Sequence, residues 1–143
     1  MTQNSGVRLR KLPENVSLQQ PQISPSDMLK VPVYILGEIP PLTELNEFLF
    51  RFGCQTDLSL QRPIKVWVNL EEDIVHEADK VLAQFVPEDL NYPFIAVILP
   101  PLVSLATAIV VRIKERCPTT KVLVIHYRKA HEPHFIGFEL FCG

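Results

Sequence analysis

The polar residues with the widest chemical repertoire gather near the C-terminus of this chain. They follow an apolar run and are His126, Tyr127, Arg128, Lys129, His131 and His134. Imidazole titrates near neutral pH and can act as a general acid or base, while guanidinium and ammonium groups bind phosphate. The cluster indicates an anion-binding segment, and it makes His126 and Arg128 the candidate catalytic residues if a reaction takes place there.

Further candidate ligand contacts follow other predicted strands. Gly37 and Asn69 come directly after or at the end of two of them, and Ser104 and Thr107 lie in the first turns of a predicted helix. Ligands of open parallel sheets bind outside the carboxyl ends of the strands, and helix N-termini attract phosphate. The predicted ligand-binding residues are therefore Gly37, Asn69, Ser104, Thr107, His126, Arg128 and Lys129.

Several kinds of chemistry are disfavoured by what the sequence lacks. It contains no Gly-x-Gly-x-x-Gly, Walker A, His-Glu-x-x-His or Gly-x-Ser-x-Gly motif, so common nucleotide cofactors and motif-bearing hydrolases are not expected. His126, His131 and His134 with Glu132 resemble zinc ligands in type, but no matching pair lies elsewhere. We therefore predict no metal and no cofactor, while keeping a small-molecule enzyme built on the histidines as a lesser alternative.

Periodicity predicts an alternating order of strands and helices. Apolar runs predict strands over 31–36, 64–69, 94–99, 121–127 and 135–141, and apolar stripes at helical spacing predict helices over 42–52, 74–85 and 102–116. This order implies right-handed crossovers. The predicted fold class is α/β, a Rossmann-like, mostly parallel sheet of about five strands flanked by three helices, with the last strand at an edge or in a hairpin.

Composition divides the chain into a flexible N-terminal arm, residues 1–30, and one domain, residues 31–143. The arm is rich in Pro and Gln, and the rest contains enough apolar residues for a core. No apolar run approaches the roughly 18 residues that span a bilayer, and no secretory signal is visible, so we expect a cytoplasmic protein. The acidic middle of the domain argues against duplex nucleic acid as a partner. The three scattered cysteines are expected to be ordinary buried residues.

The third predicted helix is apolar on nearly every side up to Arg112. A surface helix normally shows a polar face. Such a helix is either deeply covered within its own chain or buried against a second copy. We expect the second arrangement, a homodimer through residues 102–113.

One stretch resembles a known family. Residues 94–113 (FIAVILPPLVSLATAIVVRI) run from a buried strand through a Pro-Pro turn into an apolar helix, and a strand ending in His126-Tyr-Arg-Lys and a closing strand follow. This pattern resembles the small Rossmann-like accessory proteins of type III CRISPR loci, the candidate ring-nuclease group. The likeness covers residues 31–143 and leaves out the arm.

The resemblance implies a homodimer that binds a cyclic oligoadenylate across its two-fold axis, with phosphates meeting Ser104 and Thr107. It implies a role in antiviral signalling, in which the protein lowers the signal by sequestration or by metal-independent ring cleavage. Whether it is an enzyme stays open, because no side chain is placed by a motif as the catalytic group. The alternative function is a non-enzymatic protein–protein interaction module that uses the apolar third helix and the arm.

Overall fold

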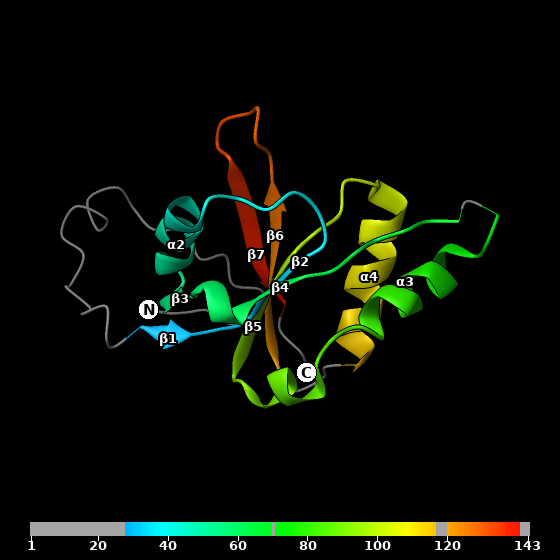
Figure 1. The fold of residues 1–143 in the computed structure, drawn as a ribbon, viewed down its shortest axis with the longest axis horizontal. Coiled ribbons are helices and arrows are strands. Elements are labelled where there is room, and N and C mark those ends of the chain that lie inside the picture. Colours follow the sequence, from blue (N-terminus) through cyan, green and yellow to red (C-terminus); the bar gives the residue numbers. More distant parts are fainter. Residues whose placement is uncertain (1–27, 70, 117–119, 141–143) are drawn as a thin grey trace, which may run out of the picture.

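The computed structural model describes residues 28–69, 71–116 and 120–140, and the first 27 residues of the predicted arm lie outside this range (Figure 1). Within the described residues the chain forms the predicted α/β fold. The helices are α2 (Leu42–Phe50), α3 (Ile74–Leu82) and α4 (Val103–Arg116), and two short 3-10 turns are η2 (Leu58–Leu60) and η3 (Pro87–Asn91).

Among the described residues, the main sheet has five strands in the order β4-β2-β5-β6-β7. Their bounds are β2 (Val33–Ile35), β4 (Gln61–Pro63), β5 (Phe94–Ile98), β6 (Lys121–Tyr127) and β7 (Phe135–Leu140). β4, β2, β5 and β6 are parallel, and β7 pairs antiparallel with β6 as a hairpin at the edge. This confirms a mostly parallel sheet flanked by three helices.

Helices cover both faces of the sheet. α2 lies on one face, and α3 and α4 lie on the other (Figure 1). Alternate residues of each central strand divide between two cores, so that Val124 belongs to the α4 side and Ile125 to the α2 side. β5 is buried along its whole length, as the unbroken apolar run predicts for a strand covered on both faces.

Most of the apolar residues of α4 are accounted for by packing within the chain. Leu105, Ile109 and Ile113 are fully buried in the core beneath it, and Arg112 donates to Asp79 of α3 at 2.9 Å. Two apolar side chains of this helix remain largely exposed, Val103 at 76% and Val111 at 52%. The homodimer through residues 102–113 stays a prediction, but the apolar content of the helix does not require it.

The strand predicted over 64–69 is wrong in position. The strand of this region is β4, at Gln61–Pro63, and it pairs with the three residues of β2. Ile64 still donates its N–H to the carbonyl of Ile35 at 2.9 Å, and the pairing with β2 ends there because β2 ends at Ile35. Alternation of apolar residues over 64–68 reflects side chains packed against the core, not a strand in the sheet.

A second, two-stranded sheet lies at the start of the described chain. β1 (Leu29–Lys30) pairs parallel with β3 (Cys54–Gln55), and Met28 is buried. Residues 28–30 of the predicted arm thus pack onto the domain. Cys54 is buried as expected, and burial, helped by the nearby Glu139 carboxylate, raises the pKa of its thiol to about 12.

A buried polar network links β2, β4 and η3. Arg62 donates from Nε and Nη2 to the two carboxylate oxygens of Asp89 at 3.0 and 3.1 Å, and the Tyr34 hydroxyl donates to the same carboxylate. The N–H of Val86 donates to Tyr34 Oη at 2.8 Å. Burial alone would raise the pKa of Asp89, but the hydrogen bonds from Arg62 and Tyr34 outweigh it and lower the pKa. The network adds side-chain hydrogen bonds between the edge strand β4 and η3 to the three-residue pairing of β4 with β2.

Candidate functional site

The strand order creates a switch point between β2 and β5. The chain leaves β2 toward α2 on one face of the sheet and leaves β5 toward α4 on the other. In open parallel sheets ligands bind in the crevice that forms where consecutive connections diverge in this way. The residues to consider are therefore those that follow β2 and β5, together with the β6–β7 hairpin beside them.

Gly37 lies at this switch point and serves close packing. A side chain at this position would place its Cβ 2.9 Å from the carbonyl oxygen of Leu99, so the two loops approach more closely than another residue would permit. Leu36 donates its N–H to the carbonyl of Ile98 at 2.9 Å and ties the same loops together. Gly37 thus allows the loops that follow β2 and β5 to pack closely against each other.

The start of α4 follows β5 at the switch point. Leu102 precedes the helix and has no side-chain acceptor with which to cap its first N–H groups, and the first turn carries no acidic residue. Ser104 is exposed there, while Thr107, one turn on, donates its hydroxyl to the carbonyl of Val103 at 2.9 Å. This helix end presents positive partial charge and an exposed hydroxyl to an anion.

The β6–β7 hairpin is held together by Arg128. Its guanidinium donates to the carbonyl of Pro133 at 3.0 and 3.3 Å, and its N–H donates to the carbonyl of His134 at 2.6 Å. His134 engages both ring nitrogens, Nδ1 with the carbonyl of Arg128 and Nε2 with Glu132 at 2.8 Å. Arg128 and His134 therefore have structural partners already, and a ligand would compete with a main-chain carbonyl for the guanidinium.

Lys129 and His126 are the more available groups of the hairpin. Lys129 Nζ lies 3.2 Å from Glu38 Oε2, an exposed ion pair that joins the hairpin to the loop after β2. His126 is exposed and follows Val124 on the face that α4 covers, toward the end where α4 begins. We refer to Glu38, Ser104, His126 and Lys129 as the carboxyl-edge site, since they follow or end β2, β5 and β6.

Asn69 has a local role at the start of α3. Its side chain accepts the N–H of Glu71 at 3.0 Å, and its own N–H donates to the buried carboxylate of Glu77 at 3.1 Å. Lys80 Nζ lies 2.9 Å from the second oxygen of Glu77. Hydrogen bonds from Lys80 and from the main chain of Asn69 lower the pKa of Glu77. Asn69 thus fixes the loop that leads into α3.

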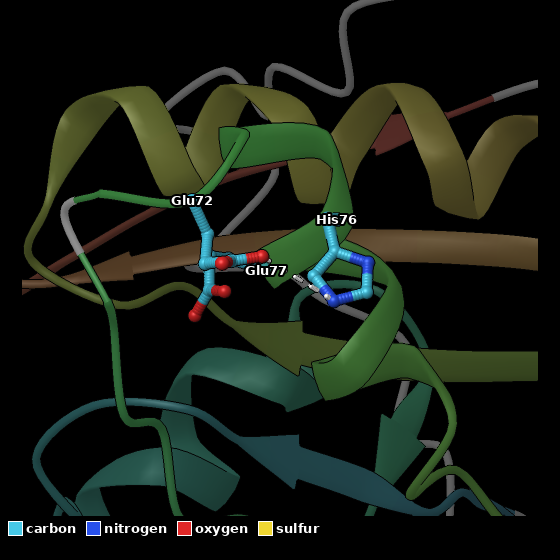
Figure 2. Close-up of side chains that lie close together, drawn as sticks. All are labelled: Glu72, His76 and Glu77. Carbon is cyan, nitrogen blue, oxygen red and sulfur yellow. Dashed lines mark ion pairs between the residues drawn. The ribbon is translucent and has the colours of Figure 1, made fainter.

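Glu72, His76 and Glu77 form the one group of metal-ligating residue types that comes together among the described residues (Figure 2). Their candidate ligand atoms lie within 4.8 Å of one another, and His76 Nε2 is 3.9 Å from Glu72. The ammonium of Lys80 already neutralises Glu77, which is the buried member. We interpret the group as a charge network around the first turn of α3.

A hollow of about 410 Å³ lies between α2 and the hairpin. Its charged lining is mainly acidic, with Glu44, Glu47 and Glu132 against Arg51 and His134. A polyanion would be repelled there. If the chain binds phosphate, the side of the sheet occupied by α4 is the better place.

The topology gathers most of the predicted ligand residues at the carboxyl edge but gives them different roles. Packing or internal hydrogen bonds engage Gly37, Asn69, Thr107 and Arg128. Ser104 and His126 are exposed, and Lys129 is exposed in its ion pair with Glu38. The sequence did not predict the pairing of Glu38 with Lys129, because nothing in it links two residues so far apart. It did not predict the Tyr34–Arg62–Asp89 network for the same reason.

Comparisons with protein-family models, with curated proteins and with solved structures gave no match. Among the described helices, none combines the length and apolarity needed to cross a membrane.

Proposed function

We propose that this chain is a Rossmann-like binder of a cyclic oligoadenylate, and that it lowers the free concentration of this second messenger in type III CRISPR antiviral signalling. The observation that carries the proposal is the carboxyl-edge site at the β2–β5 switch point. There the start of α4, which follows Leu102 and has no acidic residue in its first turn, lies on the same face as His126, and Lys129 of the hairpin pairs with Glu38. Phosphate groups suit such a site because helix N–H groups, a hydroxyl and cationic side chains all favour negative charge.

A bound phosphate would displace Glu38 from its ion pair with Lys129. Glu38 neutralises Lys129 when no phosphate is present, and a phosphate oxygen is a competing partner for the same ammonium. Because both side chains are exposed, the pair costs little to break. Glu38 is therefore compatible with anion binding, although its carboxylate reduces the local positive potential.

Sequestration is the simpler form of this function, and cleavage is the extension of it. In metal-independent cleavage a ribose 2′-oxygen attacks the adjacent phosphorus, the bond to the 5′-oxygen breaks, and a 2′,3′-cyclic phosphate and a 5′-hydroxyl result. His126 is the candidate to take the proton from the 2′-hydroxyl, since it is exposed and lies on the face of the sheet that α4 covers. Product analysis after incubation with the ring separates cleavage from binding alone.

We expect substitutions of Lys129 and Glu38 to change the affinity for a cyclic oligoadenylate in opposite directions. Lys129→Ala should weaken binding of a cyclic oligoadenylate about three- to tenfold and make binding less sensitive to salt, because a phosphate contact is lost. Glu38→Gln should strengthen binding, because it removes a competitor for Lys129. Titration calorimetry at two salt concentrations measures both changes.

Lys114→Ala, which changes an exposed lysine near the far end of α4, is the control and should bind as the parent does. Equal affinities for all four proteins would remove Lys129 from the site.

The alternative function is a protein–protein interaction module. It is favoured by a specific observation, the exposed apolar side chains Val103 and Val111 on α4. An interaction module predicts that no cyclic oligoadenylate binds and that removing residues 1–27 abolishes partner capture. A self-contained ligand binder predicts that the shortened chain keeps its affinity for the ring.

A further inference from the structure

The two edges of the main sheet differ in how they are protected. β4 is three residues long and carries Arg62 and Pro63, which are features that block pairing with another strand. β7 is six residues long, Phe135–Leu140, and contains neither Lys nor Pro. Within the described part of the chain, no strand pairs with its outer side. An unprotected apolar edge strand is a template for pairing with another chain.

The ladder shows which main-chain groups of β7 face outward. Leu99 donates its N–H to the carbonyl of Ile125 at 2.9 Å, so the carbonyl of Ile125 faces β5. Arg128 donates to the carbonyl of His134 across the hairpin. In an antiparallel ladder, hydrogen-bonded pairs alternate with non-hydrogen-bonded pairs. The main-chain groups of His134, Ile136, Phe138 and Leu140 therefore face β6. Those of Phe135, Gly137 and Glu139 therefore face outward.

The side chains of β7 on the α4 side are also uncovered. Ile136 is 44% exposed and Phe138 is 47% exposed, and in the register they lie opposite His126 and Val124 of β6. α3 and α4 pack over the inner strands, so the edge strand extends beyond them. β7 thus combines unpaired main-chain groups with two exposed apolar side chains on one face.

We propose that a second copy of this chain pairs with β7, in an antiparallel β7–β7 arrangement about a two-fold axis at Gly137. In this register Gly137 faces its own counterpart, and Phe135 faces Glu139 of the partner subunit, so all outward main-chain groups find partners. Ile136 lies opposite Phe138 of the partner subunit, which forms an apolar pair on each side of the axis.

Symmetry and charge favour a second copy as the occupant. A two-fold contact requires a self-complementary surface, and the alternation along β7 is self-complementary about Gly137. Glu139 is the one charged residue of β7. In this register it and Glu139 of the partner subunit lie at opposite ends of the strand pair. The net charge of the chain is only −2, so repulsion between two copies is weak.

The contact is small, which sets its expected strength. One strand pair with four apolar side chains buries less than the roughly 1,200–2,000 Å² of a standard interface. We therefore expect a dimer that forms and dissociates with concentration. Since the axis is perpendicular to the sheet, the carboxyl edges of the two copies point in opposite directions. The contact leaves the carboxyl-edge site of each copy open. A ring bound there would contact one copy, whereas the family resemblance places it across a two-fold axis, so neither proposal depends on the other.

Sedimentation velocity of the full chain over a series of concentrations tests the contact. We expect a monomer–dimer equilibrium, which Phe138→Lys shifts to the monomer at least tenfold in dissociation constant. Val111→Lys changes a similarly exposed apolar residue of α4 within residues 102–113, the dimer interface expected from the sequence, and so separates the two interfaces. Pairing through β7 predicts that it dimerises as the parent does. Loss of the dimer in Val111→Lys with retention in Phe138→Lys would place the interface on α4 and overturn the proposal. A parent chain that stays monomeric at all concentrations would also overturn it.

Amide hydrogen exchange supplies a test that needs no variant. The N–H groups of Gly137 and Glu139 should exchange more slowly as protein concentration rises, while that of Phe138, which faces β6, should not change. Protection of Gly137 and Glu139 that is independent of concentration would mean that another segment of the same chain covers β7, and would contradict pairing with a second copy. In the sedimentation experiment, equal melting temperatures of Phe138→Lys, Val111→Lys and the parent chain exclude misfolding as the cause of a monomeric variant.

Discussion

Asp89→Ala should lower the free energy of unfolding by about 3 kcal/mol, because breaking a buried ion pair leaves its partners without compensation. The substitution removes the acceptor for the Arg62 guanidinium and for the Tyr34 hydroxyl at once. Asp89 is almost fully buried, and through Arg62 and Tyr34 the network ties η3 to both β4 and β2. Denaturant unfolding followed by circular dichroism measures the loss.

Asp57→Ala is the matched control for this effect. Asp57 also makes an ion pair, with Lys30 at 3.4 Å, but both side chains are largely solvated, and it accepts the N–H of Ser59 at 2.9 Å as the cap of η2. An exposed ion pair contributes little to stability, and loss of a cap costs less than loss of a buried ion pair. A loss in Asp57→Ala as large as that in Asp89→Ala would show that burial of the network is not what makes it important.

The contribution of Asp89 depends on pH in a defined direction. Its folded pKa lies below its usual value, so the stabilisation is present above the unfolded pKa of about 3.9 and is lost as pH falls through the folded value. The difference in stability between the parent chain and Asp89→Ala should therefore be full at neutral pH and decrease below pH of about 4. A difference that is constant down to strongly acidic pH would contradict an ionised, paired Asp89.

Ser104→Glu should reduce binding of a cyclic oligoadenylate at least tenfold without destabilising the fold. A carboxylate in the first turn interacts favourably with the helix dipole, so α4 itself should be slightly more stable. The same carboxylate would occupy the place where a phosphate is expected and would repel it. The combination of equal or higher melting temperature and lost affinity is the expected signature, measured by thermal unfolding and titration calorimetry.

Val111→Glu is the control for the added charge. It lies on the same helix, is exposed, and is about 10 Å further along the helix axis than Ser104. We expect its affinity for the ring to stay close to that of the parent chain. If Ser104→Glu and Val111→Glu bind equally well, the start of α4 is not part of the ligand site.

The sequence predicted the helices and the central strands because their signals are local. The apolar stripe of α3 and the continuous apolar run of β5 each specify an element without reference to the rest of the chain. The strand predicted over 64–69 failed because a strand also needs a neighbour, and β2 ends after Ile35. Length of a partner strand is a property of the fold and cannot be read from the residues at 64–69.

The candidate site was predictable to the level of an edge of the sheet. Parallel strands bring their carboxyl ends together, so the order of strands and helices is enough to group Ser104, His126 and Lys129. The partners of individual side chains do not follow from that order. Arg128 is the clearest case, since its guanidinium binds the carbonyl of Pro133, and only the path of the hairpin makes this contact available.

Thermal unfolding of the full chain with a panel of cyclic oligoadenylates of different ring sizes tests the central claim most directly. A ligand present at about 100 times its dissociation constant adds roughly 2.7 kcal/mol to stability, which raises the melting temperature by several degrees. We predict such a rise for one ring size and none for a linear oligoadenylate of equal length. No rise with any ring would contradict cyclic oligoadenylate binding and would leave the interaction module as the function to test.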